Sequence, residues 1–178
     1  MRNKQSELVM TNVRPKDYKS HRDGGSDNCG DCTTRAMTYC LSGKMTYREI
    51  ESEQYRLAHI RHTRRNTTGT WDSVLVRRGF NWVQLNNLKS RANIASYLAS
   101  VDTPMVTLSC SHACAIHKGK VIDTWDSRGG RVYGILAKNE DIDKIITILS
   151  LHGIEAIRVA IPRYTPSRRK RSRWFSWF

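Results

Sequence analysis

Hydrophobic positions in the first part of the chain recur every three to four residues, which is the spacing of amphipathic helices. A first helix is predicted to begin at Asp31, a residue that can cap it, and to stop at Gly43. A second is predicted from the capping box between Thr46 and Glu49 to about Thr63. The apolar face is formed by Ala36, Met37, Cys40 and Leu41 in the first helix and by Ile50, Leu57 and Ile60 in the second.

Later positions alternate between apolar and polar residues, which is typical of strands. After a short helix at 71–78, capped by Thr70, strands are predicted at 80–85, 105–109, 113–117, 121–125 and 131–136, with a helix at 91–100 between the first two. The strands from 105 onward are expected to form an antiparallel meander. A last helix, capped by Asn139, ends at Gly153, and residues 157–161 alternate as a final strand. Helices followed by antiparallel strands predict an α+β fold, with the N-terminal helices packed on the sheet.

Three segments differ in composition. Residues 1–28 are polar and show no periodic apolar spacing, so they are interpreted as an arm and loop with no strand before the first cysteines. Residues 29–162 contain the predicted elements and form a single domain. Residues 163–178 have six positive charges and no acid, and they form a separate tail.

Composition narrows the class of protein. The chain has 178 residues, a net charge of +14 and 39% apolar residues, and it contains no apolar run of the roughly 18 residues that a membrane span requires. The N-terminus lacks the apolar stretch of a secretory signal, so we expect a host-cytoplasmic or virion location rather than secretion. Five cysteines, an odd number, fit a reducing compartment in which thiols serve packing, catalysis or metal binding.

The C-terminal tail combines cations with aromatic rings. Such a segment can neutralise phosphates while its rings stack on bases, or it can dock in the groove of a protein partner. A solvated tail is the simpler alternative. The residues concerned are Arg168, Arg169, Lys170, Arg171, Arg173, Trp174, Phe175, Trp177 and Phe178.

A cysteine, a histidine and an aspartate occur in an order that suits nucleophilic catalysis. Cys32 is predicted at a helix N-terminus, where unpaired N–H groups and the helix dipole stabilise a thiolate. His112 precedes a predicted strand and can act as its base. Asp123, on the next strand, can fix the imidazole tautomer, and Asp126 is a second candidate for that role.

These residues and their neighbours resemble the papain-like cysteine peptidases. Cys29-Gly30-Asp31-Cys32 is similar to the Cys-Gly-Ser-Cys nucleophile segment of papains, and Asp123-Thr124-Trp125 is similar to their Asn-Ser-Trp. The strand pair from Pro104 to Asp123 further resembles the NlpC and bacteriocin-processing branches, and short papain-like proteins of bacteriophages are the most similar. The resemblance covers about residues 28–133 and neither tail.

The resemblance implies a peptidase or amidase that acts by acyl transfer on a peptide or protein substrate. It assigns Cys32 as nucleophile, His112 as base, Asp123 as orienting acid and Trp125 as the shield of the His112–Asp123 contact. Papains have an oxyanion-hole glutamine six residues before the nucleophile, where this chain has Ser26, so Asn28 and the Cys32 backbone N–H are expected to replace it. No cofactor and no metal are expected.

Other functions remain open at this point. A zinc site could combine Cys29 and Cys32 with Cys110 and Cys114, with His112 and His117 in reserve. Against it, Cys110, His112 and Cys114 would lie on one strand face with about 7 Å between successive members. The Cys29–Cys32 pair could also be a thioredoxin-like redox motif. A different class is a catalytically weak or inactive papain-like scaffold that binds nucleic acid or a virion protein through its basic surface and tail.

Three other groups of residues are interpreted as structural. His59 and His62, with Arg56, Arg61, Arg64 and Arg65, are expected to form a solvated basic face. Trp71 and Trp82 are expected in the core, and Cys40 is expected to serve packing.

Overall fold

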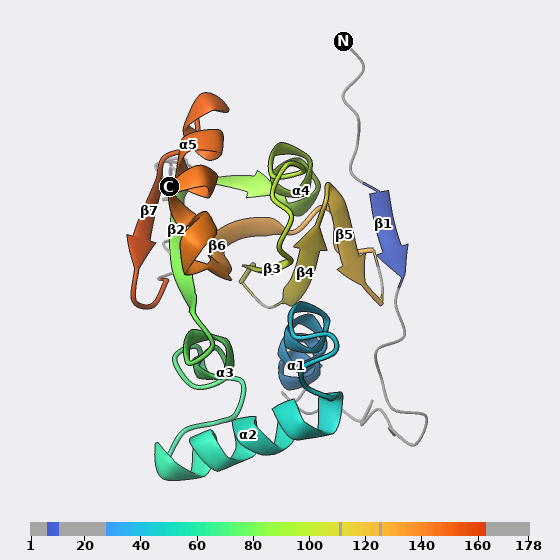
Figure 1. Ribbon diagram of the computed structural model, residues 1–178, viewed down its shortest axis with the longest axis vertical. Helices are drawn as coiled ribbons and strands as arrows, with labels where there is room; N and C mark the ends of the chain where they lie inside the picture. Colours follow the sequence, from blue (N-terminus) through green and yellow to red (C-terminus); the bar gives the residue numbers. More distant parts are fainter. Residues whose placement is uncertain (1–6, 11–27, 111, 125, 163–178) are drawn as a thin grey trace, which may run out of the picture.

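The computed structural model describes residues 7–10, 28–110, 112–124 and 126–162 (Figure 1). Within these ranges the protein is a mixed sheet with helices on both faces, and the helical and antiparallel content agrees with the predicted α+β class. None of the helices in these ranges combines the length and the apolar character needed to cross a bilayer.

The helices of the first layer are α1 (Asn28–Cys40), α2 (Tyr47–Ile60) and α3 (Ser73–Val76). The predicted capping box of α2 is confirmed, because Thr46 Oγ1 accepts from the Glu49 backbone and the Glu49 carboxylate accepts from the Thr46 N–H. The predicted start of α1 is wrong: α1 begins at Asn28, so Asp31 lies inside its first turn. An acidic residue is favoured in the first turn by the helix dipole as well as at the cap, and the residue type alone does not separate the two positions.

The sheet has seven strands in the order β1-β5-β4-β3-β6-β2-β7. Their bounds are β1 (Glu7–Met10), β2 (Phe80–Ser90), β3 (Met105–Leu108), β4 (Ala113–His117), β5 (Lys120–Asp123), β6 (Arg131–Lys138) and β7 (Ala156–Val159). Only β3, β4 and β5 form the predicted meander, since β6 returns to pair with β3 and not with β5. Hydrophobic alternation identifies strands but not their order, so this crossover was not predictable from the pattern.

A strand before the first cysteines is a second correction. β1 pairs in parallel with β5, in register from Glu7 opposite Lys120 to Met10 opposite Asp123. The sequence of β1, Glu-Leu-Val-Met, does not alternate between polar and apolar residues, and its partner is more than 100 positions away in the sequence.

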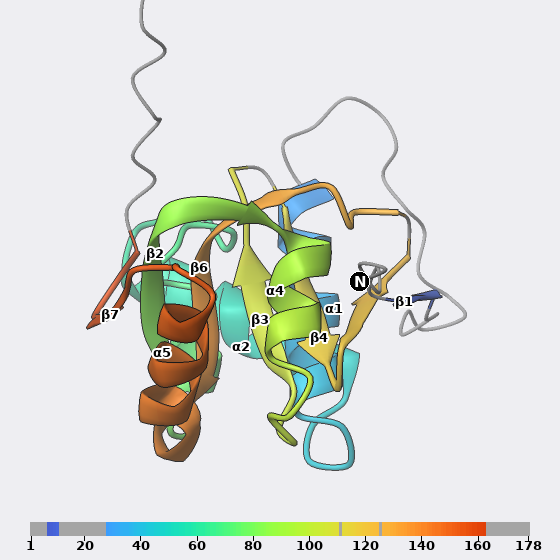
Figure 2. The ribbon, with the colours of Figure 1, turned by 90° about the horizontal axis from the view of Figure 1, so that it is seen from above.

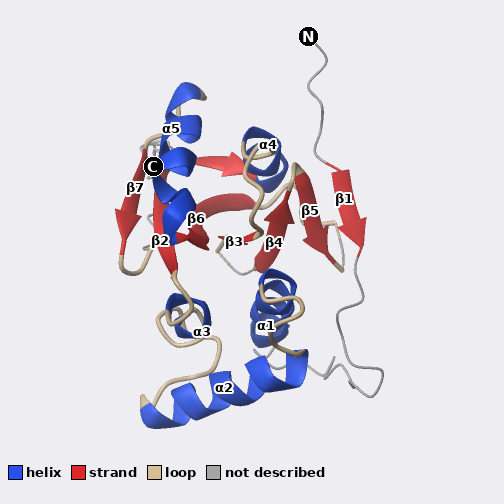
Figure 3. Cartoon of the chain, in the orientation of Figure 1, coloured by secondary structure: helices blue, strands red, loops and turns tan. Residues whose placement is uncertain are grey.

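The two helical layers cover opposite faces of the sheet, as Figures 1 and 3 show. Helices α1 to α3 pack on one face, where Met37, Leu57, Trp71 and Trp82 are almost fully buried. Helix α4 (Arg91–Tyr97), capped by Ser90, and helix α5 (Ile142–Leu151), preceded by a 3-10 turn at Asn139–Asp141, cover the other face (Figure 2). The helices therefore do not all precede the sheet or lie on one side of it.

The structural interpretations of the sequence largely hold. Trp71 and Trp82 are core residues in edge-to-face contact, with ring centroids 5.7 Å apart, and Trp82 Nε1 donates to buried Asp72. Cys40 packs partly buried against the same core. The basic face on and after α2 is exposed at Arg56, His59, Arg61, His62 and Arg64, while Arg65 is half-buried and pairs with Glu51 at 3.0 Å.

Candidate functional site

The structure brings His112 and Asp123 together at one end of the antiparallel pair β4–β5. His112 lies one residue before β4 and Asp123 is the last residue of β5, and the register of Ala115 opposite Ile122 places these strand ends side by side. His112 Nε2 is 2.5 Å from Asp123 Oδ2, and the two side chains are only 10% and 3% exposed. A short contact sheltered from water restricts the orientation of the imidazole.

Two further donors hold the Asp123 carboxylate. Ser127 Oγ donates to Oδ2 at 2.5 Å, and the Thr124 backbone N–H donates to Oδ1 at 2.7 Å. Burial alone would raise the pKa of Asp123, but the hydrogen bond and charge of His112, with the bonds from Ser127 and Thr124, outweigh burial and lower it. The carboxylate is therefore charged at neutral pH and suited to hold an imidazolium.

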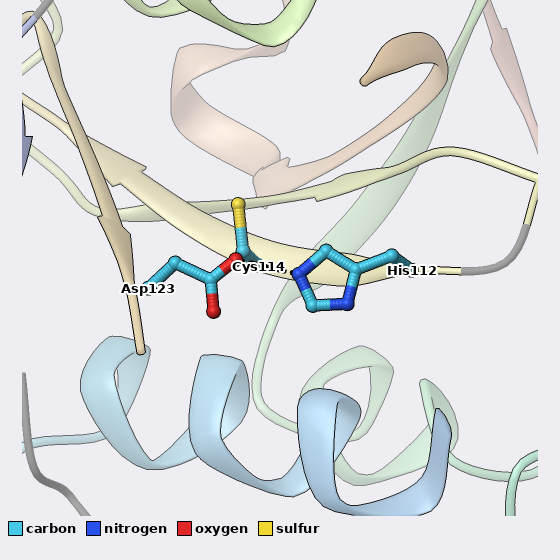
Figure 4. Close-up of side chains that lie close together, drawn as sticks. All are labelled: His112, Cys114 and Asp123. Atoms are coloured by element: carbon cyan, nitrogen blue, oxygen red, sulfur yellow. Dashed lines mark hydrogen bonds and ion pairs between the residues drawn. The ribbon is translucent and has the colours of Figure 1, made fainter. Parts of the chain in front are cut away.

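Cys32 approaches this pair from α1, which packs on β4. A small pocket is lined by Cys32 and Arg35 from α1 and by Asp123 and Thr124 at the end of β5. Figure 4 shows α1 running beneath the imidazole, with Nε2 directed toward Asp123 and the Nδ1 side of the ring facing the helix. Nδ1 is thus the ring nitrogen on the side of α1, the helix that contains Cys32.

The sequence analysis placed Cys32 at a helix N-terminus, and the structure corrects this. Because α1 begins at Asn28, Cys32 is the fifth residue of the helix, beyond the four residues whose N–H groups lack an intrahelical acceptor. The Cys32 N–H is therefore part of the helical hydrogen-bond ladder and is not an oxyanion donor, contrary to expectation. A different charge lies beside the sulfur: Arg35 Nη2 donates to Cys32 Sγ at 3.5 Å.

The remaining predicted site residues either lie outside the described residues or lie away from the His112–Asp123 pair. The side chain of Asn28, and the whole of Ser26, Trp125 and the basic aromatic tail of 163–178, lie outside the described residues. Asp126 is exposed and forms two bonds with the Arg128 guanidinium, at 2.9 and 2.8 Å, which lower its pKa to about 2. It does not replace Asp123 as the partner of His112.

Cys114 is a second thiol beside the pair. Its sulfur lies 3.6 Å from Thr107 Oγ1 and 3.8 Å from Ser127 Oγ, and burial, opposed by the Arg91 charge, raises its pKa to about 11. In Figure 4 the sulfur points away from α1. The predicted shared strand face of Cys110, His112 and Cys114 is wrong, because β4 begins at Ala113 and Cys110 lies exposed in the preceding loop.

Arg91 is a site-supporting residue that sequence reasoning missed. This first residue of α4 is 1% exposed and donates to Thr107 Oγ1, Ser109 Oγ and the carbonyls of His112 and Ser127, at 2.7 to 3.1 Å. It therefore ties together the loops that contain His112 and Ser127. A helix-initial arginine is normally a surface residue, so nothing in the local pattern indicated burial. Arg35, in contrast, was predictable as a neighbour of Cys32, because it follows Cys32 by three residues and thus lies on the same helix face.

Comparison with known proteins adds no assignment: no protein-family profile, curated protein or solved structure matches the chain. The case for function therefore depends on the geometry described above.

Proposed function

We propose that this protein is a papain-like cysteine peptidase or amidase, phage-encoded, that transfers the acyl group of a peptide or protein substrate to Cys32. The contact of 2.5 Å between His112 and Asp123, beside a pocket that Cys32 also lines, is the observation that carries the proposal. A thiol on α1, an imidazole just before β4 and a buried carboxylate at the end of β5 suit a nucleophile, a base and an orienting group.

In this mechanism His112 Nδ1 takes the proton of Cys32 Sγ, and the thiolate attacks the substrate carbonyl. Asp123, charged and held by Ser127 and Thr124, keeps Nε2 protonated and stabilises the imidazolium that forms. His112 then returns the proton to the leaving amine, and water releases the acyl group from the sulfur. The guanidinium of Arg35 favours the thiolate before attack.

An acyl-transfer experiment tests this directly. An activated ester such as p-nitrophenyl acetate is incubated with the protein, and the acetylated residue is located by mass spectrometry of peptides. We expect acetyl transfer to Cys32 in the wild type, little in His112→Ala, and an unchanged level in His117→Ala. His117 is the matched control because it lies on β4 but forms hydrogen bonds with Tyr39 and the Asp102 carbonyl, and not with Asp123.

Two results would contradict the proposal. One is acetylation of Cys32 that is equal in all three proteins, since the imidazole would then have no part in it. The other is an unmodified Cys32, which would favour the alternative of a papain-like scaffold that binds its partner through basic residues.

A further inference from the structure

The group around Asp123 contains one more reactive atom than acyl transfer requires. A ring nitrogen of His112, Cys114 Sγ and a carboxylate oxygen of Asp123 all lie within 4.8 Å of one another, at the centre of Figure 4, and Nε2 is the nitrogen beside Asp123. Cys114 has no role in the mechanism proposed above. A nitrogen, a sulfur and an oxygen donor that converge in this way form a potential set of metal ligands.

The three donor types suit zinc. Zinc accepts imidazole nitrogen, thiolate and carboxylate at about 2.0 to 2.3 Å, so its ligand atoms stand roughly 3.5 Å apart in a tetrahedron. The present spacing ranges from 2.5 Å between His112 and Asp123 to at most 4.8 Å within the group, so shifts of about 1 Å would close the site. Three protein ligands leave a fourth position for water or another small ligand.

The surroundings give an ion both access and support. Asp123 and Thr124 line the pocket beside α1, which provides a route of entry on the carboxylate side of the group. Thr124 Oγ1 is buried there with no hydrogen-bond partner among the described residues, so a metal-bound water would find an acceptor or donor. Outside the ligands, Ser127 Oγ and the Thr124 N–H already orient the Asp123 carboxylate, and Arg91 holds the His112 carbonyl.

We propose that His112, Cys114 and Asp123 bind a divalent transition-metal ion of the zinc class, which competes with the His112–Asp123 hydrogen bond. Binding places the metal on Nε2, moves the imidazole proton from Nε2 to Nδ1 and releases the Cys114 thiol proton to solvent. An imidazole protonated on Nδ1 cannot accept the proton of Cys32. The metal therefore inhibits acyl transfer, a consequence that rests on the proposed function, whereas binding itself does not.

Cobalt(II) is the probe for binding, because a thiolate ligand gives Co²⁺ a charge-transfer absorption band and tetrahedral coordination gives intense visible bands. The full-length reduced protein is titrated with Co²⁺ and then with Zn²⁺, alongside Cys114→Ser, Asp123→Asn and the control Cys32→Ser. Cys110→Ser is a second control, because Cys110 is the exposed thiol near the site. Circular dichroism establishes that each variant is folded.

We expect the charge-transfer band in the wild type and in both controls, its loss in Cys114→Ser and its displacement by Zn²⁺. Asp123→Asn is expected to weaken Co²⁺ binding at least about tenfold, and it serves as the decisive variant if Cys114→Ser does not fold. A wild type without the band, or a band that persists in Cys114→Ser, overturns the metal site. Because the readout does not use Cys32, either result leaves the acyl-transfer proposal standing, and failure of acyl transfer leaves the metal site standing.

Discussion

Two cysteines beside the His112–Asp123 pair are buried to nearly the same extent, but their thiols have different neighbours. Cys32 on α1 and Cys114 on β4 are 3% and 2% exposed. Cys32 has the Arg35 guanidinium at its sulfur, whereas the sulfur of Cys114 contacts the hydroxyls of Thr107 and Ser127 and lies near the Asp123 carboxylate. Burial raises the pKa of Cys114 although the Arg91 charge opposes it, whereas the sulfur of Cys32 accepts a hydrogen bond directly from a guanidinium. The comparison teaches that a buried thiol needs a cation in direct contact with its sulfur to serve as a nucleophile.

The largest expected difference is in the alkylation rates of the two thiols. Near neutral pH, iodoacetamide is expected to modify Cys32 at least about 100-fold faster than Cys114, because a thiol with a pKa of about 11 is almost fully protonated there. Peptide mass mapping after brief reaction measures both sites, and exposed Cys110 serves as an internal standard. Similar rates for Cys32 and Cys114 in the folded protein would remove the distinction between them.

Replacing the acid that lies beside both His112 and Cys114 is expected to have the next largest effect. Asp123→Asn is expected to lower the free energy of unfolding by about 2 kcal/mol, because buried donors lose their charged acceptor. Urea unfolding measures this. Asp126→Asn is the matched control, since Asp126 is exposed and solvent screens its pair with Arg128. Equal losses in the two variants would mean that Asp123 is no more than a surface acid.

Asp123 is also expected to make the stability of the fold depend on pH in the acidic range. The pKa of Asp123 in the folded protein lies below the value of about 3.9 for an unfolded aspartate, so the carboxylate stabilises the fold above that value. This stabilisation is expected to disappear as the pH falls through the lowered pKa. Urea unfolding at a series of acidic pH values should therefore show a steeper loss of stability in the wild type than in Asp123→Asn.

Removing the cation beside Cys32 is expected to make this thiol more like Cys114. Arg35→Gln is expected to slow alkylation of Cys32 at neutral pH about tenfold, because the thiolate loses its charged donor. Arg56→Gln, on the exposed face of α2, is the control for a general loss of positive charge. Unchanged Cys32 reactivity in Arg35→Gln would show that the guanidinium has no influence on the sulfur.

The smallest expected effect comes from substituting two adjacent glycines, which tests whether Arg91 positions the loops around the site. A Cβ added at Gly130 would lie 2.6 Å from Arg91 Nη1, whereas one at Gly129 would meet nothing within 4 Å. Gly130→Ala is therefore expected to lower the free energy of unfolding by about 1 kcal/mol and to slow Cys32 alkylation, with Gly129→Ala near wild type. If the two variants behave alike in both assays, Arg91 does not position the site.

Local patterns predicted the elements of this fold better than their arrangement. The capping box at Thr46, the strand Ala113–His117 and the tight turn that follows it depend on neighbouring residues, so the sequence contains their signal. The pairing of β6 with β3 and of β1 with β5 depends on contacts between distant segments, for which a single sequence has no local signal.

In the site too, features that depend on neighbouring residues were predictable and features that depend on distant contacts were not. The approach of His112 and Asp123 follows from two adjacent strands joined by the short turn at Lys118-Gly119, and it was predictable. The start of α1 was not, and moving it by three residues changed the expected source of thiolate stabilisation from the helix terminus to Arg35. Arg91 is buried because strand β3, the loop from Ser109 to His112 and the loop that contains Ser127 converge on it.

The pH dependence of Cys32 alkylation is the most direct test of the claim that His112 activates Cys32. Iodoacetamide rates at Cys32 are measured as a function of pH in the wild type, His112→Ala and the control His117→Ala. We expect Cys32 in the wild type and in His117→Ala to react well below the ordinary thiol pKa of about 8.5, and His112→Ala to lose that reactivity. A Cys32 that reacts only near the ordinary thiol pKa in all three proteins would contradict the account.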